Sequence, residues 1–185
     1  AGSTLEGEEA AVLDAVAVVG GPSRTFLLLA PRHPERFPAA AELLAGRGAR
    51  WAARSRLEEA PETVDVLLLD TIGDLGRAYQ LGTSAFVGGS LTARGGHNPL
   101  EPAVWGVPVL SGPHVANFRD AYDQLLAVGG ARLVSDRGEL AAALRDWLED
   151  PAAAAAAGSR ARAVVDSNRG ATARTVGALL ALVGG

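Results

Sequence analysis

A short loop from Gly95 to Glu101 carries the residue types best suited to ligand chemistry. It reads Gly-Gly-His-Asn-Pro-Leu-Glu and lies between two apolar segments that are typical of buried strands. Glycines let a backbone approach a ligand, and a helix beginning at Asn98 would offer unpaired N–H groups to a phosphate. Glu101, one turn further on, suits sugar hydroxyls. The loop therefore predicts a nucleotide or nucleotide-sugar site, with a capped helix in a tight turn as the alternative interpretation.

Basic and hydroxyl side chains gather at two further places. Arg32 and His33 directly follow the apolar run Leu27–Ala30. Arginine is a natural phosphate clamp because its fork is planar and permanently charged, although a solvated loop has the same composition. Ser3 and Thr4 offer hydroxyls to a phosphate or, equally, to the start of the helix that follows.

Composition excludes several classes of protein. The 185 residues are 48 % apolar and carry a net charge of −4, which argues against a general nucleic-acid binder. All 17 basic residues are arginine, so a phosphate would meet Arg, His, hydroxyl or backbone groups. The absence of Cys excludes disulfides and thiolate metal sites, and the three His have no zinc-site spacing.

The elements that must position these residues alternate between helix and strand. We expect strands at 25–30, 50–54, 64–69, 84–87, 107–110 and 132–134, and helices at 6–19, 34–46, 72–81, 98–105, 117–128, 136–149, from Pro151 onward and 170–183. The alternation predicts an α/β fold of Rossmann-like type, with three α/β/α layers and a mostly parallel sheet. Ligands bind at the carboxyl ends of such strands, where Arg32, Gly73 and Gly95 would lie.

Domain organisation and location follow from the same patterns. Residues 1–185 read as a single domain without internal repeats, and the lack of Met suggests a processed chain or a fragment of a longer two-domain protein. No apolar run approaches the ~20 residues that span a bilayer. A cytoplasmic domain is therefore expected, with any membrane anchor upstream.

The ordered motifs together resemble the C-terminal half of the Kdo transferases, which add 3-deoxy-D-manno-octulosonic acid (Kdo) to a lipid A precursor. The resemblance covers most of the chain. The motifs that carry it are Gly2-Ser-Thr, Ala30-Pro-Arg-His-Pro-Glu-Arg-Phe, Asp70-Thr-Ile-Gly-Asp-Leu, Phe86-Val-Gly-Gly-Ser-Leu, Gly95-Gly-His-Asn-Pro-Leu-Glu-Pro-Ala, Gly112-Pro-His and Asn117-Phe.

The resemblance implies a set of nucleotide-binding residues. These are Ser3, Thr4, Arg32, His33, Ile72, Gly73, Gly95, Gly96, Asn98 and Glu101. Arg32 and the helix start at Asn98 would meet the phosphate, and Glu101 the ribose. Leu5, Ile72 and Asp74 stand where the family usually has His, Met and Glu, which leaves the fold expectation intact but puts details of donor and acceptor in question.

The resemblance also implies a GT-B glycosyltransferase of the Gram-negative cell envelope, using CMP-Kdo as donor. No catalytic residue is expected in this chain because the family's base lies in the N-terminal half, so the isolated domain should be inactive. No metal or other cofactor is expected. The lipid A precursor and the cytoplasmic face of the inner membrane would be reached through that other half. Two alternatives stay open, a GT-B domain for another donor such as a UDP-sugar and a non-catalytic nucleotide-binding or interaction domain.

Overall fold

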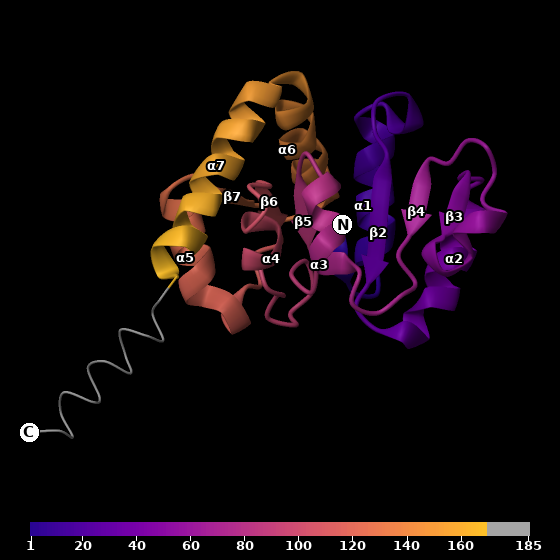
Figure 1. Cartoon of the computed structure of the whole chain (residues 1–185), viewed down its shortest axis with the longest axis horizontal. Helices are drawn as coiled ribbons and strands as arrows, with labels where there is room; N and C mark the ends of the chain where they lie inside the picture. The colour runs from indigo at the N-terminus through magenta and orange to yellow at the C-terminus, as the bar shows by residue number, and fades with distance from the viewer. Residues whose placement is uncertain (170–185) are drawn as a thin grey trace, which may run out of the picture.

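A seven-stranded parallel sheet forms the centre of the molecule (Figure 1). The computed structural model describes residues 1–169. The strands are β1 (Gly2–Thr4), β2 (Leu27–Pro31), β3 (Trp51–Ala53), β4 (Val66–Leu68), β5 (Ala85–Val87), β6 (Val109–Ser111) and β7 (Ala131–Leu133). They lie in the order β3-β4-β2-β1-β5-β6-β7, which confirms the predicted α/β architecture.

Helices connect the strands and cover the sheet. The α-helices are α1 (Glu8–Val18), α2 (Phe37–Gly46), α3 (Leu75–Ala78), α4 (Leu100–Ala103), α5 (Arg119–Ala127), α6 (Arg137–Glu149) and α7 (Pro151–Asn168). Short 3₁₀ turns are η1 (Gly21–Ser23), η2 (Pro34–Arg36), η3 (Arg54–Glu59), η4 (Tyr79–Leu81) and η5 (Ala116–Phe118). Each connection returns the chain to begin another strand in the same direction, as a parallel sheet requires.

The two larger apolar cores lie on opposite faces of the sheet, and a small third one contains Tyr79, Ala85 and Val107. Phe86 and Leu110 belong to the core under α1, α2 and α6, whereas Val87 and Val109 belong to the core under α4, α5 and α7. Neighbouring residues of one strand point to opposite faces, so these pairs separate the layers. Figure 1 shows α6 beside α1, with α4 and α5 beneath α7. Both faces of the sheet are thus buried, so a ligand can reach the sheet at the ends of its strands.

The central strand β1 was missed by the sequence reading. Gly2 to Thr4 were expected only as a hydroxyl-rich segment before a helix, but they pair with β2 on one side and β5 on the other. Three small residues carry no apolar alternation to mark a strand. Gly2 is required by a close contact, because a Cβ there would lie 2.0 Å from the Tyr79 hydroxyl oxygen.

Other expectations hold with shifted boundaries. Asp136 caps α6 as expected, accepting hydrogen bonds from the N–H groups of Gly138 and Glu139. The helix expected at 98–105 shortens to the four residues of α4, and the one at 72–81 divides into α3 and η4. The helix expected at 170–183 lies outside the described residues. Within residues 1–169, no helix has the length and apolar character needed to cross a bilayer.

Candidate functional site

The carboxyl ends of all seven strands meet at one edge of the sheet, as the sequence predicted. Strand order reverses beside β1, since the chain passes from β1 to β2 on one side and later reaches β5 on the other. The loops after β1 and β5 therefore diverge. Doubly wound sheets bind ligands at such a switch point. Eight of the ten predicted site residues, those other than Ile72 and Gly73, lie in β1 itself or in the segments that follow β2 and β5.

A buried carboxylate joins the loops at this point. Glu8, at the start of α1, is 1 % exposed. Its Oε2 accepts hydrogen bonds from the N–H groups of Leu5 (2.8 Å) and Gly89 (2.7 Å), and its Oε1 from Ser90 (2.8 Å) and Leu91 (2.9 Å). Four donors satisfy a carboxylate that burial would otherwise destabilise. The glycine turn after β5 thus already holds an anion, one from its own chain.

Thr4 and Glu9 form a second buried connection. The Thr4 side chain is fully buried, and its hydroxyl donates to Glu9 Oε1 (3.2 Å). Arg36 donates through Nη2 to Glu9 Oε2 (3.1 Å) and through Nε to Glu9 Oε1 (3.3 Å). The Thr4 hydroxyl is therefore turned to the interior. Ser3 lies beside it in a left-handed backbone conformation (φ 54°) and is also buried.

The Gly95–Asn98 loop is held by a side chain from beyond β6. Asn117 Nδ2 donates to the carbonyl oxygens of Arg94 (3.0 Å) and Gly96 (3.3 Å), and the Asn117 N–H donates to Gly95 (2.8 Å). Gly95 and Gly96 both have positive φ, 84° and 74°, which favours glycine at these positions. Gly96 also packs against the chain at His114, whose carbonyl oxygen would lie 2.9 Å from a Cβ. The loop has one defined shape before any ligand arrives.

Asn98 and Glu101 lie at the end of this loop. Asn98 Oδ1 accepts from the Leu100 N–H (3.0 Å), but the N-cap of α4 is Pro99, one residue after the expected helix start at Asn98. The N–H of Asn98 itself has no hydrogen-bond partner among residues 1–169. Because α4 has only four residues, it supplies much less of a helix dipole than the sequence suggested. Any anion binding here must come from individual N–H groups and side chains.

Glu101 is a half-buried carboxylate without a hydrogen bond or ion pair in the described part of the chain. Burial, and then the charge of Glu101, raise the pKa of the Tyr79 hydroxyl, so the two side chains are close. Trp105 Nε1 donates to the Gly76 carbonyl oxygen (2.6 Å) and ties the segment after Glu101 to α3. Glu101 thus has acceptor capacity that the described protein leaves unused.

Arg32, His33 and His97 form a basic cluster at the same edge. Burial lowers the pKa of the His97 imidazole, Arg32 lowers it further, Glu8 acts in the opposite direction and His33 contributes least. Arg32 is exposed, and its backbone N–H donates to the Thr4 carbonyl oxygen (2.9 Å). Within residues 1–169 its guanidinium has no acceptor. The structure therefore brings Arg32 and His33 to the loop that holds Asn98.

Ile72 and Gly73 lie further along the edge, after β4. Ile72 is 77 % exposed, and Gly73 has a positive φ of 94°. Their neighbour Asp74 accepts from the Thr71 hydroxyl (2.6 Å) and pairs with Arg54 (3.4 Å). No interaction found within residues 1–169 connects Ile72 or Gly73 to Arg32 or to the Gly95–Glu101 loop.

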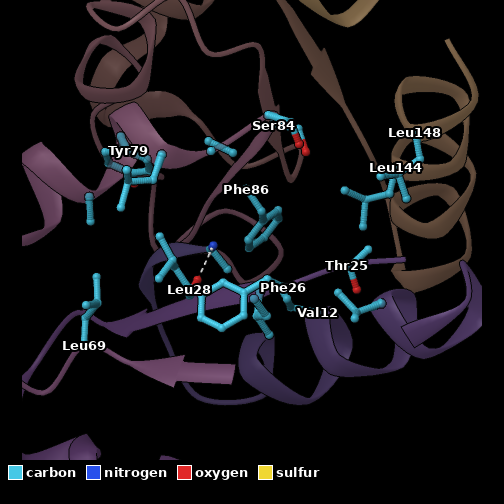
Figure 2. A pocket seen from close by; sticks show the side chains of 18 of the residues that line it. Val12, Thr25, Phe26, Leu28, Leu69, Tyr79, Ser84, Phe86, Leu144 and Leu148 are labelled. Atoms are coloured by element: carbon cyan, nitrogen blue, oxygen red, sulfur yellow. Dashed lines mark hydrogen bonds between the residues drawn. The ribbon is translucent and has the colours of Figure 1, made fainter. Parts of the chain in front are cut away.

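A cavity lies elsewhere, near the amino ends of β1, β2 and β5 (Figure 2). It measures about 450 Å³ and is mostly apolar, with Phe26, Leu28 and Phe86 around it. The Ala1 amino group lies there and donates to the Leu28 carbonyl oxygen (2.7 Å), and burial lowers its pKa to about 5. None of the ten predicted site residues lines this cavity. We therefore place the candidate site at the polar carboxyl edge, since a nucleotide phosphate requires charged and hydrogen-bonding groups.

Sequence reasoning missed Glu8, Glu9, Arg36 and His97. Glu8 and Glu9 lie in the first turn of α1, where acidic residues are common, and only their burial distinguishes them. Asn117, a residue of the family motifs, shapes the loop, whereas His114 is exposed. The part of the chain that the structure describes has no cluster of three His, Asp or Glu side chains suited to a metal.

The α/β fold corresponds to one half of a GT-B glycosyltransferase. The chain is 39 % identical over 186 residues to a 3-deoxy-D-manno-octulosonic acid transferase of Bordetella pertussis, spanning 96 % of this chain and 42 % of that protein. The Haemophilus influenzae transferase is 37 % identical over 176 residues, 94 % and 41 % of the two chains. No family model matches.

A solved structure gives the same relationship in three dimensions. The C-terminal CMP-Kdo binding domain of WaaA from Acinetobacter baumannii is 31 % identical, with a TM-score of 0.81 over 89 % of this chain and 86 % of that one. The chain belongs to the Kdo transferase family, as a counterpart of its C-terminal domain. It spans about two fifths of the length of the curated relatives it matches.

Proposed function

We propose that this chain binds CMP-Kdo through the loops at the carboxyl edge and serves as the donor-binding domain of a Kdo transferase. One observation carries the proposal. A guanidinium and a half-buried carboxylate, Arg32 and Glu101, both lack partners in residues 1–169 and lie on the edge where doubly wound sheets bind nucleotides. The similarity to a solved CMP-Kdo binding domain supports the choice of donor.

Each group has a role that suits its chemistry. Arg32 would pair with the phosphate, assisted by the free N–H of Asn98 and, at longer range, by His33. Glu101 would accept hydrogen bonds from the ribose hydroxyls. Gly95 and Gly96 would hold the loop in its positive-φ shape against Asn117 and His114. Ser3, Thr4, Ile72 and Gly73 also remain proposed nucleotide contacts. They would reach the nucleotide through their backbone groups or after a movement of their loops.

Calorimetric titration of the 185-residue chain with CMP, UMP, UDP, ADP and GDP tests the proposal. We expect weak, measurable binding of CMP and weaker binding of the others. The control variant Glu149→Ala removes an exposed carboxylate at the end of α6 that is not among the predicted site residues. It should bind CMP like the parent. Equal or tighter binding of UDP would contradict the Kdo assignment and favour a GT-B domain with another donor.

In the longer protein, the reaction would be displacement of CMP from Kdo by a hydroxyl of a lipid A precursor. Arg32 would stabilise the charge that develops on the departing phosphate. The base would come from the other half of the protein, because a base must reach the proton that it removes and no carboxylate here faces an acceptor site that we can identify. The reaction would need no metal, and it would take place at the cytoplasmic face of the inner membrane.

The isolated chain should therefore bind the donor without transferring Kdo. Incubation of the purified chain with CMP-Kdo and a lipid A precursor, with and without magnesium, should give no Kdo-lipid product by mass spectrometry. A full-length relative assayed in parallel controls for donor decay. Product formation by the 185-residue chain would show that it contains a base of its own.

A further inference from the structure

The backbone of His97 is fixed, while its side chain lacks a partner. The His97 N–H donates to the Gly88 carbonyl oxygen (3.1 Å), and its carbonyl oxygen accepts from the Tyr122 hydroxyl (3.4 Å). The ring packs on Gly89, where a Cβ would lie 2.8 Å from Nε2. Nε2 is buried without a hydrogen-bond partner in the described residues. Leaving a buried polar atom without a hydrogen bond destabilises the folded protein, so an unpaired Nε2 beside the candidate site points to a ligand.

The charges around the ring come from two elements. Arg32 and His33, after β2, oppose protonation of His97, and Glu8 on α1 favours it. Glu8 is already surrounded by four N–H donors, which offset part of its charge. Tyr122, on α5, contacts the His97 carbonyl through a hydroxyl that stays neutral, since burial raises its pKa to about 12. Burial and Arg32 together therefore favour a neutral imidazole in the ligand-free protein.

An anion bound at Arg32 would reverse this balance. Its negative charge would offset the charge of Arg32, and protonated imidazole gains a second N–H donor. We propose that His97 is a proton-coupled anion-binding residue, which takes up one proton when the phosphate of the nucleotide binds beside Arg32. The inference rests on the proposed function, because it requires the phosphate to bind at this edge.

The linkage has a definite direction. Affinity for CMP should be insensitive to pH below the pKa of His97 in the free protein, because both states are then protonated. It should fall by up to about tenfold per pH unit between the free and bound pKa values, and level off above the bound one. Cytidine, which lacks the phosphate, should show no such dependence on His97.

Calorimetry in two buffers of different ionisation enthalpy measures the proton uptake directly. We expect uptake with CMP for the parent, and its loss in both His97→Gln and His97→Asn, which guards against one variant failing to fold. Comparison with the parent removes the contribution of the phosphate's own titration. The matched control is His114→Gln, an exposed imidazole outside the proposed binding groups, which should retain the uptake.

NMR gives a second readout, because the chain has only three histidines to assign. The pKa of the His97 imidazole should rise on addition of CMP, while that of His114 should not. CMP binding with an unchanged His97 pKa, or with equal proton uptake in parent and His97 variants, overturns this inference alone. Failure of CMP to bind at all overturns the proposed function and the inference with it.

Discussion

Glu101 has the clearest single-residue test, because a half-buried carboxylate without a protein partner should bind ligand hydroxyls. Replacement by Ala should weaken CMP binding by roughly 1.5–3 kcal/mol, the range for hydrogen bonds to a charged group. The loss for 2′,3′-dideoxy-CMP should be much smaller, since that ligand lacks both hydroxyls. Calorimetry with the two ligands measures the difference, and equal losses would make Glu101 a structural residue of α4.

Arg32 should act on the phosphate and leave the base and sugar unaffected. Arg32→Ala is expected to reduce affinity for CMP while leaving cytidine binding little changed, because only CMP carries the charge. Arg32→Lys should recover only part, since lysine lacks the planar fork. Arg145→Ala, which removes an exposed arginine of α6, is the charge-matched control. If both Arg32 variants bind CMP like the parent, the phosphate is bound by the free N–H of Asn98 and not by Arg32.

The residues of this edge differ in how far the sequence predicts them. Arg32 and Asn98 could be predicted because each follows an apolar strand, and parallel strands bring their carboxyl ends together. The role of Glu8 could not, because its partners Gly89 to Leu91 are more than 80 residues away in the chain. Carboxylates at a helix start are normally solvated, and only the tertiary fold shows that this one is buried.

At the scale of elements, the approach of β5 to β1 depends on Gly88. A Cβ at Gly88 would lie 2.5 Å from the Ser3 carbonyl oxygen and 2.6 Å from the Thr4 Cα, both backbone atoms that cannot easily move. Gly88→Ala should therefore destabilise the fold by about 1–3 kcal/mol, the cost of overpacking, and weaken CMP binding by displacing the loop. Urea unfolding and calorimetry measure the two effects.

Gly46 provides the control for that substitution. It ends α2, and a Cβ there would meet nothing within 4 Å. Gly46→Ala should be neutral or stabilise the protein by up to about 1 kcal/mol, because alanine restricts the unfolded chain. Equal stability of both alanine variants would mean that the strands tolerate a wider spacing than their close contact indicates.

The elements themselves were largely predictable, with one instructive exception. Strands such as β2 and β4 are continuous apolar runs, which fits a sheet covered on both faces. β1 has no such run, since it consists of three small residues. It is stabilised by pairing with β2 and β5, and Gly2 packs closely against Tyr79. Its place at the centre is set by tertiary pairing that no local pattern encodes.

At the scale of the whole molecule, the buried carboxylate of Glu8 occupies a site that a small anion from solution could otherwise fill. Four backbone N–H groups converge on it, as they would on a small oxyanion arriving from solution. Removing this side chain, as in Glu8→Gly, would leave the same four N–H donors around an empty space about the size of a propionate ion. Folding would then be linked to the concentration of that ion, since a ligand that binds only the native state stabilises it. Folding of the whole domain in this variant could thereby be controlled by adding or removing the ion.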